Sequence, residues 1–170
     1  MHRLILMRHA KTERTAASGH DRDRALTARG REDGLLMGRV LFEKGLRPDL
    51  ALVSTSTRTR QTWELLQEAF GDVEVRLVPD LYNATADVIR RFVEGAEDEA
   101  GCLLILAHNP GVHLLAHEYL VESAASPSVL DRMAAGFPTA AAAVFEVDVA
   151  GRCAYDGYLV PKAFGGGADE

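Results

Sequence analysis

Short apolar runs alternate with helical patterns along most of this chain. Residues 4–7, 50–53 and 102–107 are continuous apolar runs of strand length, and each one ends at a polar segment. Continuous runs of this kind are typical of strands buried on both faces of a parallel sheet. Residues 74–78 alternate between polar and apolar side chains, which predicts a further strand that ends at Pro79.

Amphipathic helices are predicted between these strands. Thr27 is a candidate N-cap for a first helix that stops at Gly45, and Gly71 closes a second helix. The apolar positions that define the four helical faces are Leu36, Met37, Val40 and Leu41; Trp63, Leu66, Ala69 and Phe70; Val88, Ile89, Phe92, Val93 and Ala96; and Val112, Leu115, Ala116, Tyr119 and Leu120.

The C-terminal part of the chain departs from this alternation. Residues 123–138 are rich in small side chains and predict an irregular crossing with a short helix around Leu130. Residues 140–149 and 152–160 predict a hairpin that turns at Ala150-Gly151.

Strand and helix therefore alternate before the closing hairpin, and this order predicts the fold class. We expect a single three-layer α/β/α domain with a mostly parallel central sheet, helices on both faces and a C-terminal hairpin. We place the domain at residues 1–163 and expect a flexible tail at 164–170, where glycine is frequent.

Composition is that of an ordinary globular domain, since 47% of the 170 residues are hydrophobic and 26% are charged. No apolar run is long enough for a membrane helix and the start does not resemble a signal peptide, so we expect a cytoplasmic protein with no membrane partner. Cys102 and Cys153 lie in apolar runs without metal-binding spacing, which favours a core role. The net charge of -6 argues against nucleic acid as a partner. An anionic substrate would need a local cluster of cations.

Cationic side chains follow the predicted strands. The first strand ends in Arg8-His9, the segment after the second contains Arg58, and the third is followed by His108. Ligands of open α/β sheets bind at the carboxyl ends of the strands, so we expect these side chains to meet in one crevice. The polar segment 11–24 has the length of a binding loop beside that crevice.

Several blocks resemble one known family. They are Arg8-His9-Ala10, the run from Ser54 to Thr62 (STSTRTRQT) and His108-Asn109-Pro110-Gly111, and they occur in the order of the signature blocks of the histidine phosphatase superfamily. The segments Leu81-Tyr82-Asn83-Ala84 and Asp23-Arg24-Ala25-Leu26-Thr27 are most similar to its SixA-type branch of phosphohistidine phosphatases. The resemblance covers residues 3–162 or so.

This resemblance implies roles for individual residues. His9 would be the nucleophile that becomes phosphorylated, while Arg8, Arg58 and a protonated His108 would hold the phosphoryl oxygens. Arg24 is a further candidate for substrate binding. Lys11 and Arg14 are either ordinary exposed charges or charges that help to attract phosphate. No metal or organic cofactor is implied. Each of these side chains taken alone has an ordinary structural explanation, and only their joint occurrence in family order favours catalysis.

The proton donor is where this chain departs from many members of the superfamily. Those members carry a carboxylate after the third strand, where this chain has Leu81-Tyr82-Asn83-Ala84. The alternatives are Asp21, Asp23, Asp80 and a site without a proton donor. Imidazole is a far better leaving group than an alkoxide, so a site without an acid suits phosphohistidine better than a phosphomonoester.

Three functions remain open from the sequence. The leading hypothesis is a phosphatase acting on phosphohistidine in a signalling or phosphotransfer protein. The alternatives are a phosphomonoesterase for a small phosphorylated metabolite and a phosphate-recognition module without turnover. His113 and His117 share a helix face but lack a third ligand, so we expect surface or packing roles. The oligomeric state stays open.

Overall fold

The computed structural model describes residues 1–167 and forms one α/β domain around a six-stranded sheet. Its strands are β1 (Arg3–Arg8), β2 (Leu50–Ser54), β3 (Glu74–Val78), β4 (Cys102–Ala107), β5 (Ala142–Val147) and β6 (Cys153–Leu159). Its α-helices are α1 (Ala28–Glu43), α2 (Thr57–Phe70), α3 (Ala86–Gly95), α4 (Gly111–Glu122) and α5 (Pro127–Ala134). Short 3₁₀ helices are η1 (Asp21–Asp23), η2 (Pro79–Leu81) and η3 (Pro161–Phe164).

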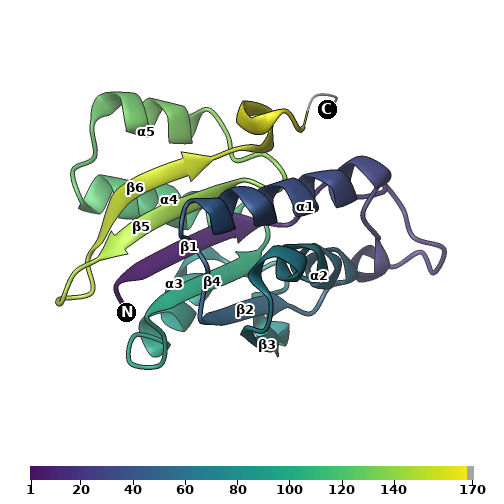
Figure 1. Ribbon diagram of the computed structural model, residues 1–170, viewed down its shortest axis with the longest axis horizontal. Helices are drawn as coiled ribbons and strands as arrows, with labels where there is room; N and C mark the ends of the chain where they lie inside the picture. The colour runs from purple at the N-terminus through teal and green to yellow at the C-terminus, as the bar shows by residue number, and fades with distance from the viewer. Residues whose placement is uncertain (168–170) are drawn as a thin grey trace.

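The sheet has the strand order β3-β2-β4-β1-β5-β6. β1 to β4 run parallel to one another, and the hairpin β5–β6 adds an antiparallel pair beside β1. Figure 1 shows this arrangement, with β1 and β4 side by side in the middle of the sheet. The carboxyl ends of β1, β2 and β4 therefore meet at one edge.

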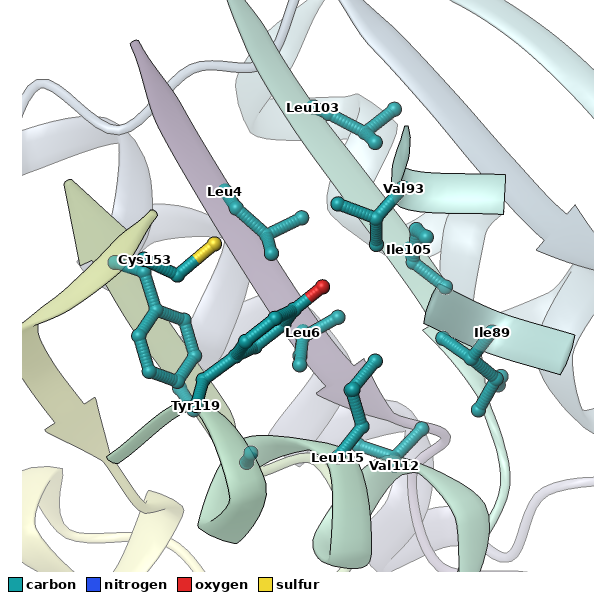
Figure 2. Close-up of a cluster of buried hydrophobic side chains, with 14 of the residues drawn as sticks. Leu4, Leu6, Ile89, Val93, Leu103, Ile105, Val112, Leu115, Tyr119 and Cys153 are labelled. Carbon is teal, nitrogen blue, oxygen red and sulfur yellow. The ribbon is translucent and has the colours of Figure 1, made fainter. Parts of the chain in front are cut away.

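Helices cover both faces of the sheet because successive strand side chains point to opposite faces. Leu4 and Leu6 of β1 belong to a core beneath α3, α4 and α5, whereas Ile5 and Met7 belong to a core beneath α1 and α2. Figure 2 shows the first of these cores, where side chains of β1 and β4 meet those of α3 and α4. Cys102 and Cys153 are free and buried in these cores.

Three helices begin where the sequence supplies a hydroxyl cap. The Thr27 side chain accepts a hydrogen bond from the Gly30 N–H at the start of α1, and Ser56 does the same for Thr59 at the start of α2. Thr85 caps α3 in the same way. The cap at Ser56 fixes where α2 begins and so places Arg58 in its first turn.

The predicted fold class is confirmed, including the parallel sheet, the helices on both faces and the C-terminal hairpin. The short helix around Leu130 is also confirmed, as α5. In the described part of the predicted tail, Phe164 ends η3 and packs against the α1–α2 core. The Gly167 N–H donates to the carboxylate of Asp33, which is buried in α1. Residues 168–170 of the predicted tail lie outside the described residues.

No helix among residues 1–167 combines the length and the apolar character that crossing a membrane requires.

Candidate active site

The register of the parallel strands brings the two strand-end histidines together. Arg8 pairs with Ala107 across β1 and β4, so His9 and His108 follow at neighbouring positions. The His9 N–H donates to the Ala107 carbonyl oxygen at 3.3 Å, and the two imidazole centroids lie 5.4 Å apart. The expectation that these side chains share one crevice is thus met in the structure.

A polar cavity of about 580 Å³ lies at the carboxyl ends of these strands. All of the site residues predicted from the sequence line this cavity, namely Arg8, His9, Arg24, Arg58 and His108. The full lining is Arg8, His9, Lys11, Thr12, Asp21, Arg24, Arg58, Asn83, His108, Asn109 and Thr139. This lining contains several cationic side chains, of Arg8, Lys11, Arg24 and Arg58, and one carboxylate, that of Asp21. The cavity therefore suits an anion although the whole chain is acidic.

His9 is held as a neutral imidazole with a defined tautomer. Its side chain is buried, and Nδ1 lies 2.8 Å from the Ala10 carbonyl oxygen. A carbonyl can only accept, so Nδ1 carries the proton and Nε2 keeps its lone pair. Burial lowers the pKa of His9 to about 3, and the positive charges of Arg8 and Arg58 act in the same direction.

His108 is also neutral, and we assign it the same Nδ1–H tautomer. Its Nε2 lies 2.8 Å from Oγ of Ser54. The fully buried Ser54 hydroxyl has no other side-chain partner within residues 1–167, so we infer that it donates to Nε2. The proton then sits on Nδ1, which has no hydrogen-bond partner in the described part of the chain.

The resemblance implies that His108 is a donor when protonated, and the structure shows its state in the free protein. Burial lowers the pKa of His108 to about 4, with the nearby Arg58 adding to the effect. In the free protein at neutral pH the imidazole is therefore uncharged. It still offers a donor, because the neutral ring carries Nδ1–H.

Arg58 is the most deeply buried cation of the cavity and is held by the loop after β1. Nη1 donates to the Asp21 carbonyl oxygen at 3.0 Å, and Nη2 donates to the Asp21 carboxylate at 3.1 Å. Arg24 bonds the same carboxylate through Nε at 3.0 Å, and the Tyr82 hydroxyl donates to it as well. The hydrogen bond from Tyr82 is the largest cause that lowers the pKa of Asp21, so this carboxyl is ionised.

The other candidates for a proton donor lie elsewhere. Asp23 accepts from the Ser18 hydroxyl on the exposed loop and does not line the cavity. Asp80 lines a separate hollow together with Tyr82 and Phe92. Of the three, only Asp21 reaches the site, and it does so as a charged group.

Sequence reasoning missed the groups that join the blocks to one another. Oγ1 of Thr62 accepts from the Ala10 N–H at 3.0 Å and donates to the Arg58 carbonyl oxygen at 2.7 Å, so it ties the β1 loop to α2. Asn109 Nδ2 donates to the Phe137 carbonyl oxygen at 2.8 Å. Ser54, Thr62 and Asn109 all belong to the recognised sequence blocks, so the sequence did point to these residues. Their hydrogen-bond partners, however, are determined only by the fold.

The remaining candidates have ordinary places. Lys11 lines the cavity, whereas Arg14 is exposed and outside its lining. His113 bonds the Met133 carbonyl oxygen at 2.6 Å and stacks near Phe137, which is a packing role between α4 and α5. Among residues 1–167 no group of three or more His, Cys, Asp or Glu side chains is arranged to hold a metal ion.

Comparisons with known proteins agree with the site. The family model of the histidine phosphatase superfamily (branch 1) matches residues 4–88. A candidate phosphohistidine phosphatase SixA from Agrobacterium tumefaciens superposes with a TM-score of 0.83 at 27% identity, over 94% of this chain and 98% of that one. A second candidate SixA, from Nakamurella multipartitia, gives a TM-score of 0.81 at 27% identity, over 94% and 96%.

A curated relative is more distant and longer. An uncharacterised chloroplastic protein of Arabidopsis thaliana is 29% identical over 119 residues, which are 64% of this chain and 55% of that protein. This chain thus matches only about half the length of that relative. Family model, fold and site geometry together identify the chain as a member of the histidine phosphatase superfamily, branch 1, and as a histidine phosphatase of the SixA type.

Proposed function

We propose that the protein removes phosphoryl groups from phosphohistidine on a signalling or phosphotransfer protein, through a covalent intermediate on His9. The free Nε2 of His9 attacks phosphorus in line with the bond to the substrate imidazole. That P–N bond breaks as the new one forms, and the substrate imidazole, which carries a proton on its other nitrogen, leaves as a neutral ring. Water then attacks phosphorus on His9 and releases inorganic phosphate, which restores the neutral histidine.

Charge on the transferred phosphoryl group is balanced by the cavity. Arg8 and Arg58 supply guanidinium donors, and His108 supplies its Nδ1–H. Nε of Arg58 and Nδ1 of His108 are buried and without hydrogen-bond partners among residues 1–167. Buried donors of this kind are costly unless an acceptor is supplied, which favours binding of an anion.

The observation that carries the choice of substrate is the state of Asp21. It is the sole carboxyl group in the lining of the cavity, and its ion pairs with Arg58 and Arg24 and the Tyr82 hydroxyl keep it ionised. An ionised carboxylate cannot protonate a leaving alkoxide, and general-acid help is worth roughly a hundredfold or more. Imidazole leaves with much less help, so phosphohistidine fits this site best.

Short connections around the cavity support a protein substrate. α2 begins at Thr57 directly after β2 ends at Ser54, and α4 begins at Gly111 after β4 ends at Ala107. The segment from β3 to α3 holds only η2 and a few further residues. No inserted subdomain from these connections covers the strand ends, so a side chain on another protein can reach His9.

The direct test follows the phosphoryl group. The protein is incubated with a phosphohistidine-bearing protein labelled on phosphorus, quenched in alkali, and mapped for label, with His9→Ala as the control. We expect label on His9 that is chased to free phosphate, and no label in His9→Ala. Phosphate release by well-folded His9→Ala at the wild-type rate would contradict the proposal.

A small phosphorylated metabolite is the second candidate. It is favoured by Lys11 and Arg24 in the lining, since both could bind an anionic part of such a molecule. A panel of small phosphomonoesters, compared with the phosphohistidine protein at equal concentration, separates the two. Binding of phosphoprotein without any turnover would instead indicate a recognition module. The cytoplasmic location stays a prediction.

A further inference from the structure

The inference concerns Asp21, and it rests on the proposed function because it assigns a role within the same reaction. Within residues 1–167, Asp21 accepts from both terminal nitrogens of Arg58, through its carbonyl oxygen and its carboxylate. Arg58 itself is only 3% exposed. The orientation of this buried guanidinium in the free protein is therefore set by a residue of the loop after β1.

We propose that Asp21 is the positioning residue of Arg58: it holds the end of the guanidinium so that the Nε edge is presented to the phosphoryl group. A guanidinium binds an anion best through two parallel N–H groups, and rotation of the plane would break that geometry. Both Nη atoms bond Asp21, while the buried Nε has no partner among residues 1–167. The contacts thus hold both terminal nitrogens and leave the Nε N–H without a protein acceptor.

The Asp21 carboxylate is held in place by two further hydrogen bonds, which a residue that positions another side chain requires. Arg24 bonds Oδ1 at 3.0 Å, and the Tyr82 hydroxyl bonds Oδ2. The Tyr82 ring lies edge-on to His108, with centroids 5.5 Å apart, and its centroid is 5.7 Å from the Arg58 guanidinium carbon. One tyrosine therefore contacts Asp21, Arg58 and His108 and couples the loop to the deep part of the cavity.

Two other roles for Asp21 would have different effects on the reaction rate and on phosphate binding. A proton donor would matter most for substrates with poor leaving groups. A competitor, which occupies Arg58 until substrate displaces it, would weaken phosphate binding and slow the enzyme. A positioning residue matters equally for all leaving groups, and its removal lowers the rate although it takes a negative charge out of an anion site.

The experiment compares Asp21→Asn with Asp23→Asn. Asp23 is the matched control because it lies in the same 3₁₀ helix, is exposed and does not line the cavity. We measure kcat/KM on a series of aryl phosphates whose phenols differ in pKa, and the inhibition constant of inorganic phosphate. Thermal melting of each variant shows that it is folded.

We expect Asp21→Asn to lower kcat/KM about tenfold for every aryl phosphate, with an unchanged slope against leaving-group pKa, because small displacements of a catalytic group cost up to about a hundredfold. The inhibition constant of phosphate should stay within about twofold of the wild type or fall. Asp23→Asn should match the wild type. A loss that grows with leaving-group pKa, a rise in kcat/KM, or equal rates in both variants would each overturn the proposal.

Tyr82→Phe gives an independent reading, since it removes only the hydroxyl that bonds Asp21. We expect a smaller loss in kcat/KM, and no further loss when it is combined with Asp21→Asn, because both act on the same contact. Additive losses would overturn the coupling. Failure of the proposed function is distinguishable, because it would appear as wild-type turnover that does not depend on His9.

Discussion

The cavity is built from two regions of unlike construction. Its deep part consists of His9, Arg58 and His108, which are 6%, 3% and 2% exposed. The two histidines directly follow buried strands, and Arg58 lies in the first turn of α2. Its rim consists of Asp21 and Arg24, which lie on a long loop, and the Asp21 side chain is half exposed. The deep groups would touch the phosphoryl group, whereas the rim groups hold the deep ones.

This difference shows how a small domain can place catalytic groups precisely and still leave the cavity open to a substrate. Groups that must be placed to within a fraction of an ångström are carried by strand ends and a helix start, where the surrounding core limits movement. Orientation of Arg58 is left to a loop that also lines the way in. Substitutions in the rim should therefore lower activity less than substitutions in the deep part of the cavity.

The largest difference is expected between the two arginines. Arg58→Lys should lower kcat/KM about a hundredfold, because a lysine cannot keep both bonds to Asp21 and present a second edge to phosphate. Arg24→Lys should cost only a few-fold, since Arg24 acts on the rim carboxylate from the exposed side. Steady-state kinetics on one aryl phosphate measures both.

The comparison would be wrong if both variants lost activity to the same extent. Equal melting temperatures of the two variants are needed to assign the loss to the site. Inorganic phosphate is a useful second probe, because Arg58→Lys should also weaken its inhibition while Arg24→Lys should leave it nearly unchanged.

Sequence predicted the deep part of the site far better than the rim. His9, Arg58 and His108 follow apolar runs, and strand ends of a parallel sheet meet at one edge, so their meeting could be inferred from the order of elements. The contact between Asp21 and Tyr82 joins residues 61 positions apart, and no periodicity encodes it. Three aspartates remained candidates for the proton donor until their positions relative to the cavity were known.

Burial is the other property that the sequence left undetermined. A histidine after a strand is compatible with either charge state, and only the folded chain shows how deeply the ring of His108 is buried and that burial lowers its pKa. The tail at residues 164–167 gives a similar lesson. Its glycines predict mobility, and nothing in the sequence indicates that Phe164 packs against the α1–α2 core or that Asp33 accepts from the Gly167 N–H.

Burial of the two histidines should also make the fold sensitive to acid. The unfolded chain binds a proton on each histidine near pH 6.5, whereas the folded pKa values are lowered to about 3 for His9 and about 4 for His108. The unfolded state therefore binds more protons between these values, and stability present above pH 6.5 is lost as the pH falls. At pH 5 this amounts to about 2 kcal/mol for each histidine.

Urea unfolding at pH 7.5 and pH 5.0 tests this sensitivity. His9→Gln should lose about 2 kcal/mol less stability between the two pH values than the wild type, because glutamine does not titrate there. The same pH dependence in both proteins would show that His9 is not held neutral by burial, and the nucleophile role would lose its electrostatic basis.

The smallest effect is expected at Ser54, which touches the deep part without reaching the cavity lining. Ser54→Ala removes the hydroxyl that donates to Nε2 of His108, so the proton can move from Nδ1 to Nε2. We expect kcat/KM to fall about tenfold or less, which is the range of one buried hydrogen bond. Ser54→Cys keeps the shape with a weaker donor and should fall between alanine and the wild type.

Nitrogen chemical shifts of the His108 ring measure the cause directly, because protonated and unprotonated imidazole nitrogens differ clearly. In the wild type we expect the Nδ1–H tautomer, and in Ser54→Ala a mixture of both. A single Nε2–H tautomer in the wild type would mean that Ser54 accepts rather than donates. Nδ1 of His108 would then carry a lone pair toward the site, and this histidine could not stabilise the phosphoryl oxygens without first gaining a proton.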